Sequence, residues 1–229
     1  MGPRYAGTLM IVAVAATAGA PAWAAQTSGP SWRPTLTAGT DNRSKDASKS
    51  GGDPYVAGTL EWNDDSGLFY GGPAFDTIDS STGSRLEVQA YAGVRPRWAG
   101  FQLDLRAAYK QQIDADTGAD DDAWEYTANI TRAIGPGKAR LQYQFTPDTA
   151  GAAHGWTWIE ARLAWPLARA LSGSAAIGRR EQQDSVDYTG WNAGVAWTAT
   201  DRLTLDLRWY GTDARVAGPT YRDELVALA

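Results

Sequence analysis

The chain has 229 residues, no cysteine and a formal net charge of -5 at pH 7. The absence of cysteine excludes a disulfide-stapled module and a thiolate metal site, and the acidic balance argues against a nucleic-acid binder, which usually carries a basic face. The 11 Trp and 10 Tyr residues far outnumber the 4 Phe residues. This bias is typical of rings at a membrane–water boundary, although a carbohydrate-binding surface can share it.

The first 24 residues resemble a secretory signal peptide. Arg4 stands in a short basic start, an apolar run follows over about residues 8–20, and the small-residue pattern "AWA" ends at Ala24. The apolar run is shorter than the roughly 20 residues that a membrane-anchoring helix needs. We therefore expect a signal peptide over residues 1–24 and one mature domain over residues 25–229.

Segments in which apolar and polar residues alternate then follow one another to residue 229. This period of two predicts strands, because successive side chains of a strand point to opposite faces. Their length is close to the roughly 9–11 residues with which a tilted strand crosses a bilayer. In chain order, we expect strands over 33–40, 55–62, 68–75, 85–94, 101–110, 124–133, 139–145, 156–165, 173–179, 188–199, 202–211 and 221–229.

The connections between these strands alternate between long polar loops and short turns. The long loops are 41–54, 76–84, 111–123, 146–155, 180–187 and 212–220, and the short turns are 63–67, 95–100, 134–138, 166–172 and 200–202. Outer-membrane barrels have short turns at the periplasmic end and longer loops outside, whereas a Greek-key sandwich has no reason to sort its loops. The fold class predicted is therefore an all-β, antiparallel, up-and-down transmembrane β-barrel of about 12 strands, with 10 or 14 as alternatives.

Aromatic residues of the apolar parity lie near both ends of the strands, with aliphatic residues between them. This arrangement predicts two aromatic girdles around an apolar band that faces lipid. Trp158 and Tyr210 fall on the opposite parity and are exceptions. The tryptophans that we assign to the girdles are Trp62, Trp124, Trp165, Trp191, Trp197 and Trp209.

The other parity carries charged residues, which would line the lumen of a barrel. Since an unpaired charge away from bulk water costs several kcal/mol, we expect these charges to pair with one another. The outer face of a soluble sheet would explain the charges equally well, but it would not explain the girdles or the alternation of loops. The predicted lumen-lining residues are Glu61, Glu87, Asp104, Arg106, Glu125, Arg140, Glu160, Arg162, Asp206 and Arg208.

No motif in the chain indicates catalysis or a cofactor. The single histidine, His154, has no Gly-x-Ser-x-Gly sequence to accompany it, so we expect no enzyme activity. In "DADTGADDD", residues 114–122, the carboxylates of Asp114, Asp116 and Asp120 are the one calcium candidate. The stretch departs from the usual calcium loop, because its glycine comes one position early and no Glu closes it. The alternative is a hydrated acidic outer loop that shares divalent cations with lipopolysaccharide phosphates.

"YVAGTLEWNDDSGLFYGG", "RLEVQAYAGVRPRWAGFQLDLRAAY" and "WEYTANI" resemble the TorF / Gcw_chp family of outer-membrane porins. The resemblance implies a small outer-membrane barrel with channel activity. Two positions depart from the family pattern: Asp41 stands where an aromatic residue is expected, and the chain ends on Ala229 rather than on an aromatic residue. The positions that carry the resemblance are Gly58, Ser66, Gly67, Phe69, Gly71, Glu87, Tyr91 and Gly93.

From these features we expect a passive channel for small polar solutes in the outer membrane of a Gram-negative bacterium. Its partners would be outer-membrane lipid, lipopolysaccharide and the solute, and its mixed-charge lumen would be narrow. Around eight strands the side chains fill a barrel, whereas sixteen or more leave an open channel. A non-conducting structural or adhesive barrel is therefore one alternative, and a soluble periplasmic carbohydrate-binding β-sandwich is another.

Overall fold

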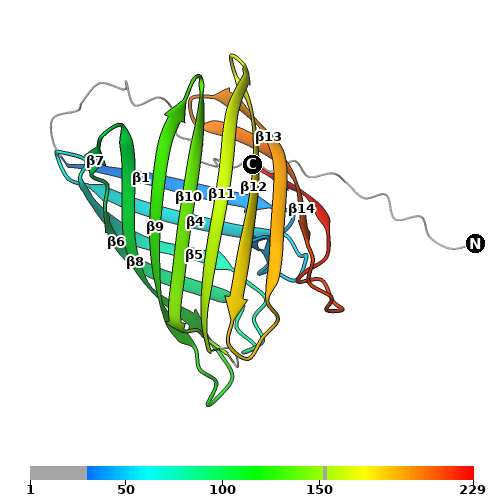
Figure 1. Cartoon of the computed structure of the whole chain (residues 1–229). Helices are drawn as coiled ribbons and strands as arrows, with labels where there is room; N and C mark the ends of the chain where they lie inside the picture. Colours follow the sequence, from blue (N-terminus) through cyan, green and yellow to red (C-terminus); the bar gives the residue numbers. More distant parts are fainter. Residues whose placement is uncertain (1–29, 152–153) are drawn as a thin grey trace, which may run out of the picture.

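The computed structural model describes residues 30–151 and 154–229, so the predicted signal peptide lies outside the described residues. These residues form strands and their connections (Figure 1). Among them there is no helix that could cross a membrane.

Twelve strands pair side by side, and the pairing of the first with the last closes them into a barrel (Figure 1). Around the ring the order is β6-β5-β4-β1-β15-β14-β13-β12-β11-β10-β9-β8, and β8 pairs with β6. This confirms the predicted architecture and strand number. The strands are β1 (Ser31–Gly39), β4 (Tyr55–Asn63), β5 (Phe69–Thr77), β6 (Leu86–Val94), β8 (Phe101–Ile113), β9 (Asp122–Ile134), β10 (Gly137–Asp148), β11 (His154–Ala168), β12 (Leu171–Gln182), β13 (Tyr188–Thr200), β14 (Leu203–Thr212) and β15 (Glu224–Leu228).

The barrel has two distinct ends. The connections β4–β5, β9–β10, β11–β12 and β13–β14 are short turns at one end, called the turn end below. The connection from β6 to β8 is also at this end and contains the two-residue strand β7 (Arg97–Trp98), which pairs with the start of β8. The longer connections, which include β1–β4 and β8–β9, are at the other end, called the loop end.

Several predicted strand boundaries differ from the structure by a few residues, and two of these differences are informative. We expected Pro166 to end a strand, but β11 continues to Ala168 with a register shift between these two residues. A bulge tolerates proline because the residue there has no ladder hydrogen bond to donate. Near residue 229 the predicted strand is too long: β15 covers only Glu224–Leu228, and the carbonyl oxygen of Tyr221 accepts a hydrogen bond from the Thr212 hydroxyl.

The outward face of the barrel is apolar. Five of the six predicted girdle tryptophans are exposed there, and Trp62 is half-buried. Trp32, which the prediction missed, is also exposed and lies directly opposite Trp62 in the β1–β4 register. Between the rings, the exposed residues include Leu105, Ile130, Leu141, Ile159 and Leu163.

Trp158 lies inside the barrel, which explains why its parity was exceptional. Its side chain is only 1% exposed and covers Gly178 of the neighbouring strand β12. The ring centroid of Trp158 is 6.2 Å from that of Tyr188. A glycine at position 178 is needed because a Cβ atom there would overlap the indole ring.

We predict that Gly178→Ala destabilises the barrel. The added methyl group forces Trp158 out of a fully buried position, and overpacking of this kind typically costs about 1–3 kcal/mol. Unfolding in urea, followed by heat-modifiable gel migration of the detergent-folded protein, measures the loss. The control is Gly173→Ala on the same strand, where the Cβ atom meets only the flexible end of Leu167 at 3.1 Å. An equal loss in both variants would contradict the packing argument.

Candidate functional site: the lumen and its inner hairpin

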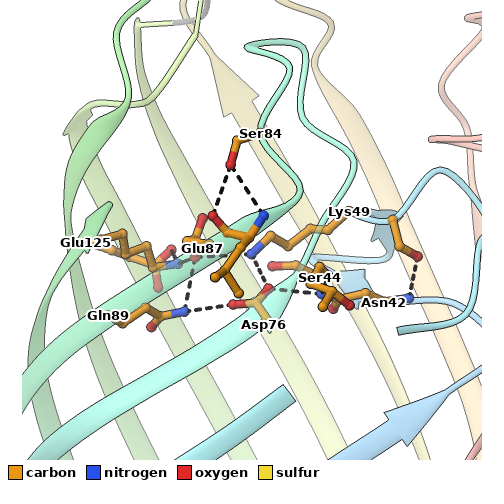
Figure 2. A network of polar contacts seen from close by, with 12 residues as sticks. Asn42, Ser44, Lys49, Asp76, Ser84, Glu87, Gln89 and Glu125 are labelled. Carbon is orange, nitrogen blue, oxygen red and sulfur yellow. Dashed lines mark hydrogen bonds and ion pairs between the residues drawn. The ribbon is translucent and has the colours of Figure 1, made fainter. Parts of the chain in front are cut away.

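The long connection between β1 and β4 folds into the barrel instead of extending outward. We call residues 41–53 the inner hairpin, because they contain the paired two-residue strands β2 (Arg43–Ser44) and β3 (Ala47–Ser48). Figure 2 shows Asn42, Ser44 and Lys49 of the inner hairpin among side chains of the surrounding strands. From the sequence we expected a charged outer loop here, so the position of this segment in the lumen is a correction.

Asp41 anchors the base of the inner hairpin. Its side chain is fully buried, and its Oδ1 accepts hydrogen bonds from the hydroxyls of Ser48 at 2.5 Å and Ser50 at 2.8 Å. Its Oδ2 pairs with the guanidinium of Arg43. The carboxylate thus ties both sides of the hairpin together, which gives a structural reason for the acidic residue where the family resemblance predicts an aromatic one.

The tip of the inner hairpin has a strained backbone. Lys45 and Asp46 have φ angles of 55° and 63°. Two-residue hairpin turns with both central residues at positive φ strongly prefer Asn-Gly, because a Cβ atom is disfavoured there. Such conformations persist only where surrounding contacts hold them. We infer that contacts with the barrel wall keep the tip in this conformation.

Acidic residues of the wall hold one side of the inner hairpin. Lys49 Nζ lies 2.6 Å from Asp76 Oδ2 and 3.1 Å from Glu87 Oε1. Figure 2 shows the side chain of Lys49 directed toward these two residues. Gln89 donates to the same two carboxylates, at 3.2 Å and 3.0 Å. These contacts fix the hairpin against β5 and β6.

Two further cations of the hairpin reach other parts of the wall. Lys45 Nζ lies 3.1 Å from Glu125 Oε2 on β9, which also contacts Lys110 Nζ at 3.1 Å. Arg43 Nη2 lies 3.1 Å from Glu224 Oε2 on β15. Lys45, Lys49 and Arg43 therefore bind carboxylates on widely separated strands, so the hairpin spans the loop half of the lumen.

An aromatic cluster packs against the opposite side of the inner hairpin. Ala47 is buried with Trp156, Trp158 and Tyr188. Lys45 Nζ lies 4.2 Å from the ring centroid of Trp156, and the Tyr188 hydroxyl donates to the Lys45 carbonyl oxygen at 2.7 Å. These inward aromatic residues therefore contact the hairpin rather than lipid.

The ten predicted lumen residues all lie on the inner face of the barrel, and nine of them form ion pairs; within the described residues Arg106 forms none. Arg140 Nη2 reaches across from β10 to Glu160 Oε1 at 2.5 Å. Other pairs join residues two apart on one strand: Arg162 Nε is 3.0 Å from Glu160 Oε1, and Arg208 Nη2 is 2.9 Å from Asp206 Oδ2. The structure thus brings these residues into local pairs rather than into one ring. The ten residues are Glu61, Glu87, Asp104, Arg106, Glu125, Arg140, Glu160, Arg162, Asp206 and Arg208.

Three charged residues that complete this network were missed. Asp76 and Arg95 fell in predicted connections, and Lys110 was the last residue of a predicted strand. Arg95 Nη1 lies 2.9 Å from Glu61 Oε1, and its Nε lies 3.7 Å from Asp104 Oδ2. Parity could have found them, because each continues the inward-facing parity of its strand.

The acidic stretch proposed as a calcium candidate does not form a metal site. Among residues 30–151 and 154–229, no group of three His, Cys, Asp or Glu side chains could hold a metal ion. Backbone hydrogen bonds fix this loop to its neighbours: the Asp116 N–H donates to the Thr82 carbonyl, and the Asp120 carbonyl accepts from Gly151, both at 2.8 Å. The carboxylates of Asp114, Asp116 and Asp120 are not gathered into such a group.

His154 lies at the exposed loop end of β11. Its Nδ1 atom is 3.4 Å from Asp148 Oδ1, and its Nε2 atom is 3.8 Å from Asp184 Oδ2. The structure thus places this histidine beside two exposed carboxylates.

Burial perturbs the titration of the inner hairpin. It raises the pKa of Asp46 to about 6, although a hydrogen bond from Asn192 Nδ2 at 2.6 Å opposes the shift. Burial also lowers the pKa of Lys45 to about 7, against the attraction of Glu125. For Lys49, attraction by Glu87 and Asp76 outweighs burial and raises its pKa. The tip thus holds a carboxyl group that resists ionisation, beside an amine that resists protonation.

We predict that Asp46→Asn stabilises the docked hairpin at neutral pH. Because the pKa of Asp46 is raised from 3.8 to about 6, docking favours its protonated form. The contribution of Asp46 is therefore most favourable below pH 4 and is lost as the pH rises through 6. Asparagine keeps the acceptor for Asn192 without the charge. Hydrogen exchange of residues 41–53, corrected for intrinsic rates, should be slower in the variant at pH 7.

The matched control for this prediction is Asp53→Asn, at an exposed position at the base of the same hairpin. It should exchange like the unmodified protein at every pH. The difference between Asp46→Asn and the unmodified protein should shrink between pH 6 and pH 4. A difference that is the same at pH 4 and pH 7 would contradict the titration of Asp46.

Comparisons with known proteins agree with this architecture. A crystal structure of an outer membrane channel from Pseudomonas putida F1 superposes with a TM-score of 0.55 and 13% identity, covering 89% of this chain and 95% of the other. A second structure, described in a study of the in-meso crystallization of membrane proteins, gives a TM-score of 0.54 and 13% identity, with coverages of 87% and 80%. At this identity the likeness shows the fold alone.

Comparison by sequence gives a family match. No curated protein matches the chain. The model of one family, described as "Bacterial protein of unknown function (Gcw_chp)", matches residues 25–228. That range covers nearly the whole chain and includes all twelve barrel strands, so the chain belongs to the Gcw_chp family of bacterial proteins.

Proposed function

We propose that the protein is a passive outer-membrane channel for small polar solutes. The observation that carries the proposal is a closed barrel with a polar interior, in which an inner hairpin fills the loop half. Solutes would diffuse along the polar inner face, and the narrowest section would lie beside the inner hairpin. The likeness to a solved outer membrane channel supports this proposal at the level of the fold.

The two halves of the lumen differ in how far water reaches the side chains. In the loop half, the side chains of Glu87 and Lys45 are only 8% and 7% exposed. In the turn half, the side chains of Arg140 and Asp104 are 33% and 28% exposed. Exposure also varies within each half, since Arg208 and Asp206 toward the turn end are only 9% and 3% exposed. We propose that the inner hairpin limits the size of solute and that water reaches Arg140 and Asp104 from the turn end.

The outer surface supports a place in a membrane. A continuous band of exposed aliphatic residues with tryptophans toward both ends matches the outer-membrane pattern. The surroundings proposed are outer-membrane lipid and lipopolysaccharide. We propose no enzyme activity and no cofactor for this barrel.

A second candidate is a non-conducting structural or adhesive barrel. The observation that favours it is the same hairpin, because three of its cations bind wall carboxylates and its aromatic contacts leave Tyr188 and Trp158 fully buried. In that case the hairpin would be a plug. The closed sheet leaves no place for the carbohydrate-binding sandwich considered above.

Planar bilayer recording separates the two candidates. We predict that the unmodified protein forms small, ohmic channels. Replacement of residues 42–51 by a short Gly-Ser linker should raise the single-channel conductance severalfold, because it removes the constriction of the loop half. Heat-modifiable gel migration first shows that the variant is folded.

The matched control shortens residues 115–119 in the loop between β8 and β9, which has no ion pair with the lumen wall within the described part of the chain. Its conductance should equal that of the unmodified protein. If the folded unmodified protein is silent and only the hairpin variant conducts, the hairpin is a plug and the structural role is correct. If both are silent, the channel proposal fails.

A further inference from the structure

We propose that the turn half of the lumen selects small anions, with the guanidinium groups of Arg106, Arg140 and Arg162 binding their carboxylate, phosphate or sulfate groups. These three residues are called the arginine strip below. The inference rests on the proposed channel function and names the class of solute. It comes from the different balance of charge in the two halves of the barrel.

In the loop half, each wall carboxylate is already compensated. Asp76 and Glu87 bind Lys49, and Glu125 binds both Lys45 and Lys110. Glu224 likewise binds two arginines, Arg43 of the inner hairpin and Arg222 just before β15. Within the described residues, Arg180 of this half forms no ion pair and its buried Nε has no hydrogen-bond partner, but its guanidinium carbon lies 4.7 Å from the Trp156 ring centroid.

In the turn half, the arginines outnumber their carboxylate partners. Glu160 is shared by Arg140 and Arg162. Glu61 and Asp104 both pair with Arg95, so there the carboxylates outnumber the arginine. Within residues 30–151 and 154–229, Arg106 forms no ion pair at all, so Arg95 and the arginine strip together are four cations facing three carboxylates.

The orientation of Arg106 is fixed although it lacks a counter-ion. Its guanidinium carbon lies 4.1 Å from the ring centroid of Tyr91, and Nη2 donates to Gln89 Oε1 at 3.3 Å. Stacking occupies a face of the guanidinium and leaves its in-plane N–H groups available for oxygen ligands. A pre-oriented guanidinium with spare donors is the usual means of binding a planar or tetrahedral oxyanion.

Two donors of the strip have no hydrogen-bond partner. The Nε atoms of Arg106 and Arg140 are buried and unpaired. A buried unsatisfied donor costs about 1–3 kcal/mol, more when it is charged, and so indicates a missing acceptor. An anion or a water molecule in the lumen would satisfy these groups, and an anion would also neutralise the excess charge.

The strand between these arginines adds hydrogen-bonding groups without negative charge. Arg106 is on β8 and Arg140 is on β10, with β9 between them. The β9 residues opposite them in register are Thr127 and Thr131, and Asn129 lies between these two on the same face. The wall from β8 to β10 thus offers hydroxyl and amide groups beside two arginines, and the carboxylate opposite Asn129, Asp104, pairs with Arg95. Rings of arginine or lysine are the usual lining of anion pores.

Reversal potentials across a planar bilayer with a KCl gradient test this inference. The unmodified protein should pass chloride in preference to potassium. Arg106→Gln and Arg140→Gln should each lower the ratio of chloride to potassium permeability roughly fivefold, which corresponds to about 1 kcal/mol, the energy of two unit charges 4 Å apart in water. Inorganic phosphate should reduce the chloride current of the unmodified protein, and less so in the variants.

The matched control is Arg132→Gln, which removes the same charge from the outer face, where Arg132 lies 4.8 Å from the Phe101 ring centroid. Its permeability ratio should not change. Arg106→Lys keeps the charge, so it should keep the chloride preference while losing part of the phosphate block. This variant keeps the test valid if Arg106→Gln does not fold.

The outcomes distinguish the two proposals. Channels that conduct but prefer potassium, or whose ratio is unchanged in Arg106→Gln and Arg140→Gln, overturn the anion selectivity and leave the channel function intact. A folded protein that is silent, with and without the inner hairpin, overturns the channel function and the anion selectivity with it. An equal shift in Arg132→Gln also overturns the assignment to the arginine strip.

Discussion

Closure of the sheet is the constraint on which the rest of this structure depends. Because twelve alternating strands form one ring, every second side chain is confined to a shared interior. Bulk water cannot solvate all of these side chains, so their charges need partners close by. The pairs Glu160–Arg162 and Asp206–Arg208 meet this need within single strands, two residues apart. An unpaired charge in such an interior therefore indicates a ligand or a function rather than packing.

The inner hairpin and the acidic residues of the wall stabilise each other. Without the hairpin, Asp76 and Glu87 would face the lumen with Lys110 as their nearest wall cation. Without the wall, the left-handed backbone of Lys45 and Asp46 would have nothing to hold it. The hairpin thus compensates the charge of the wall carboxylates, and the wall holds the strained backbone of the hairpin tip. The hairpin is thus an integral part of the barrel, even though its sequence is that of a polar loop.

The sequence predicted the strands and their faces because a period of two is repeated over every wall segment. The inner hairpin escaped prediction because its strands have two residues each, too few to show a period. Its position follows from contacts between distant segments, such as Lys45 with Glu125. Composition held one clue: the cations of residues 43–49 balance the carboxylates that the strand pattern placed toward the loop end. The pairing itself could not be derived, because many pairings satisfy the same charges.

Size selection and charge selection fall on different parts of this barrel. The hairpin narrows the loop half, where wall carboxylates and cations already compensate each other, so it acts by volume. The arginine strip lies in the hydrated turn half, where Arg106 has no carboxylate partner, so it acts by charge. Within the described residues no ion pair joins the two parts, although the Asp46 carboxylate at the hairpin tip acts electrostatically on Arg162. A change at Arg106 or Arg140 should therefore alter selectivity more than conductance. A single constriction could not separate these properties, whereas two sections in series can.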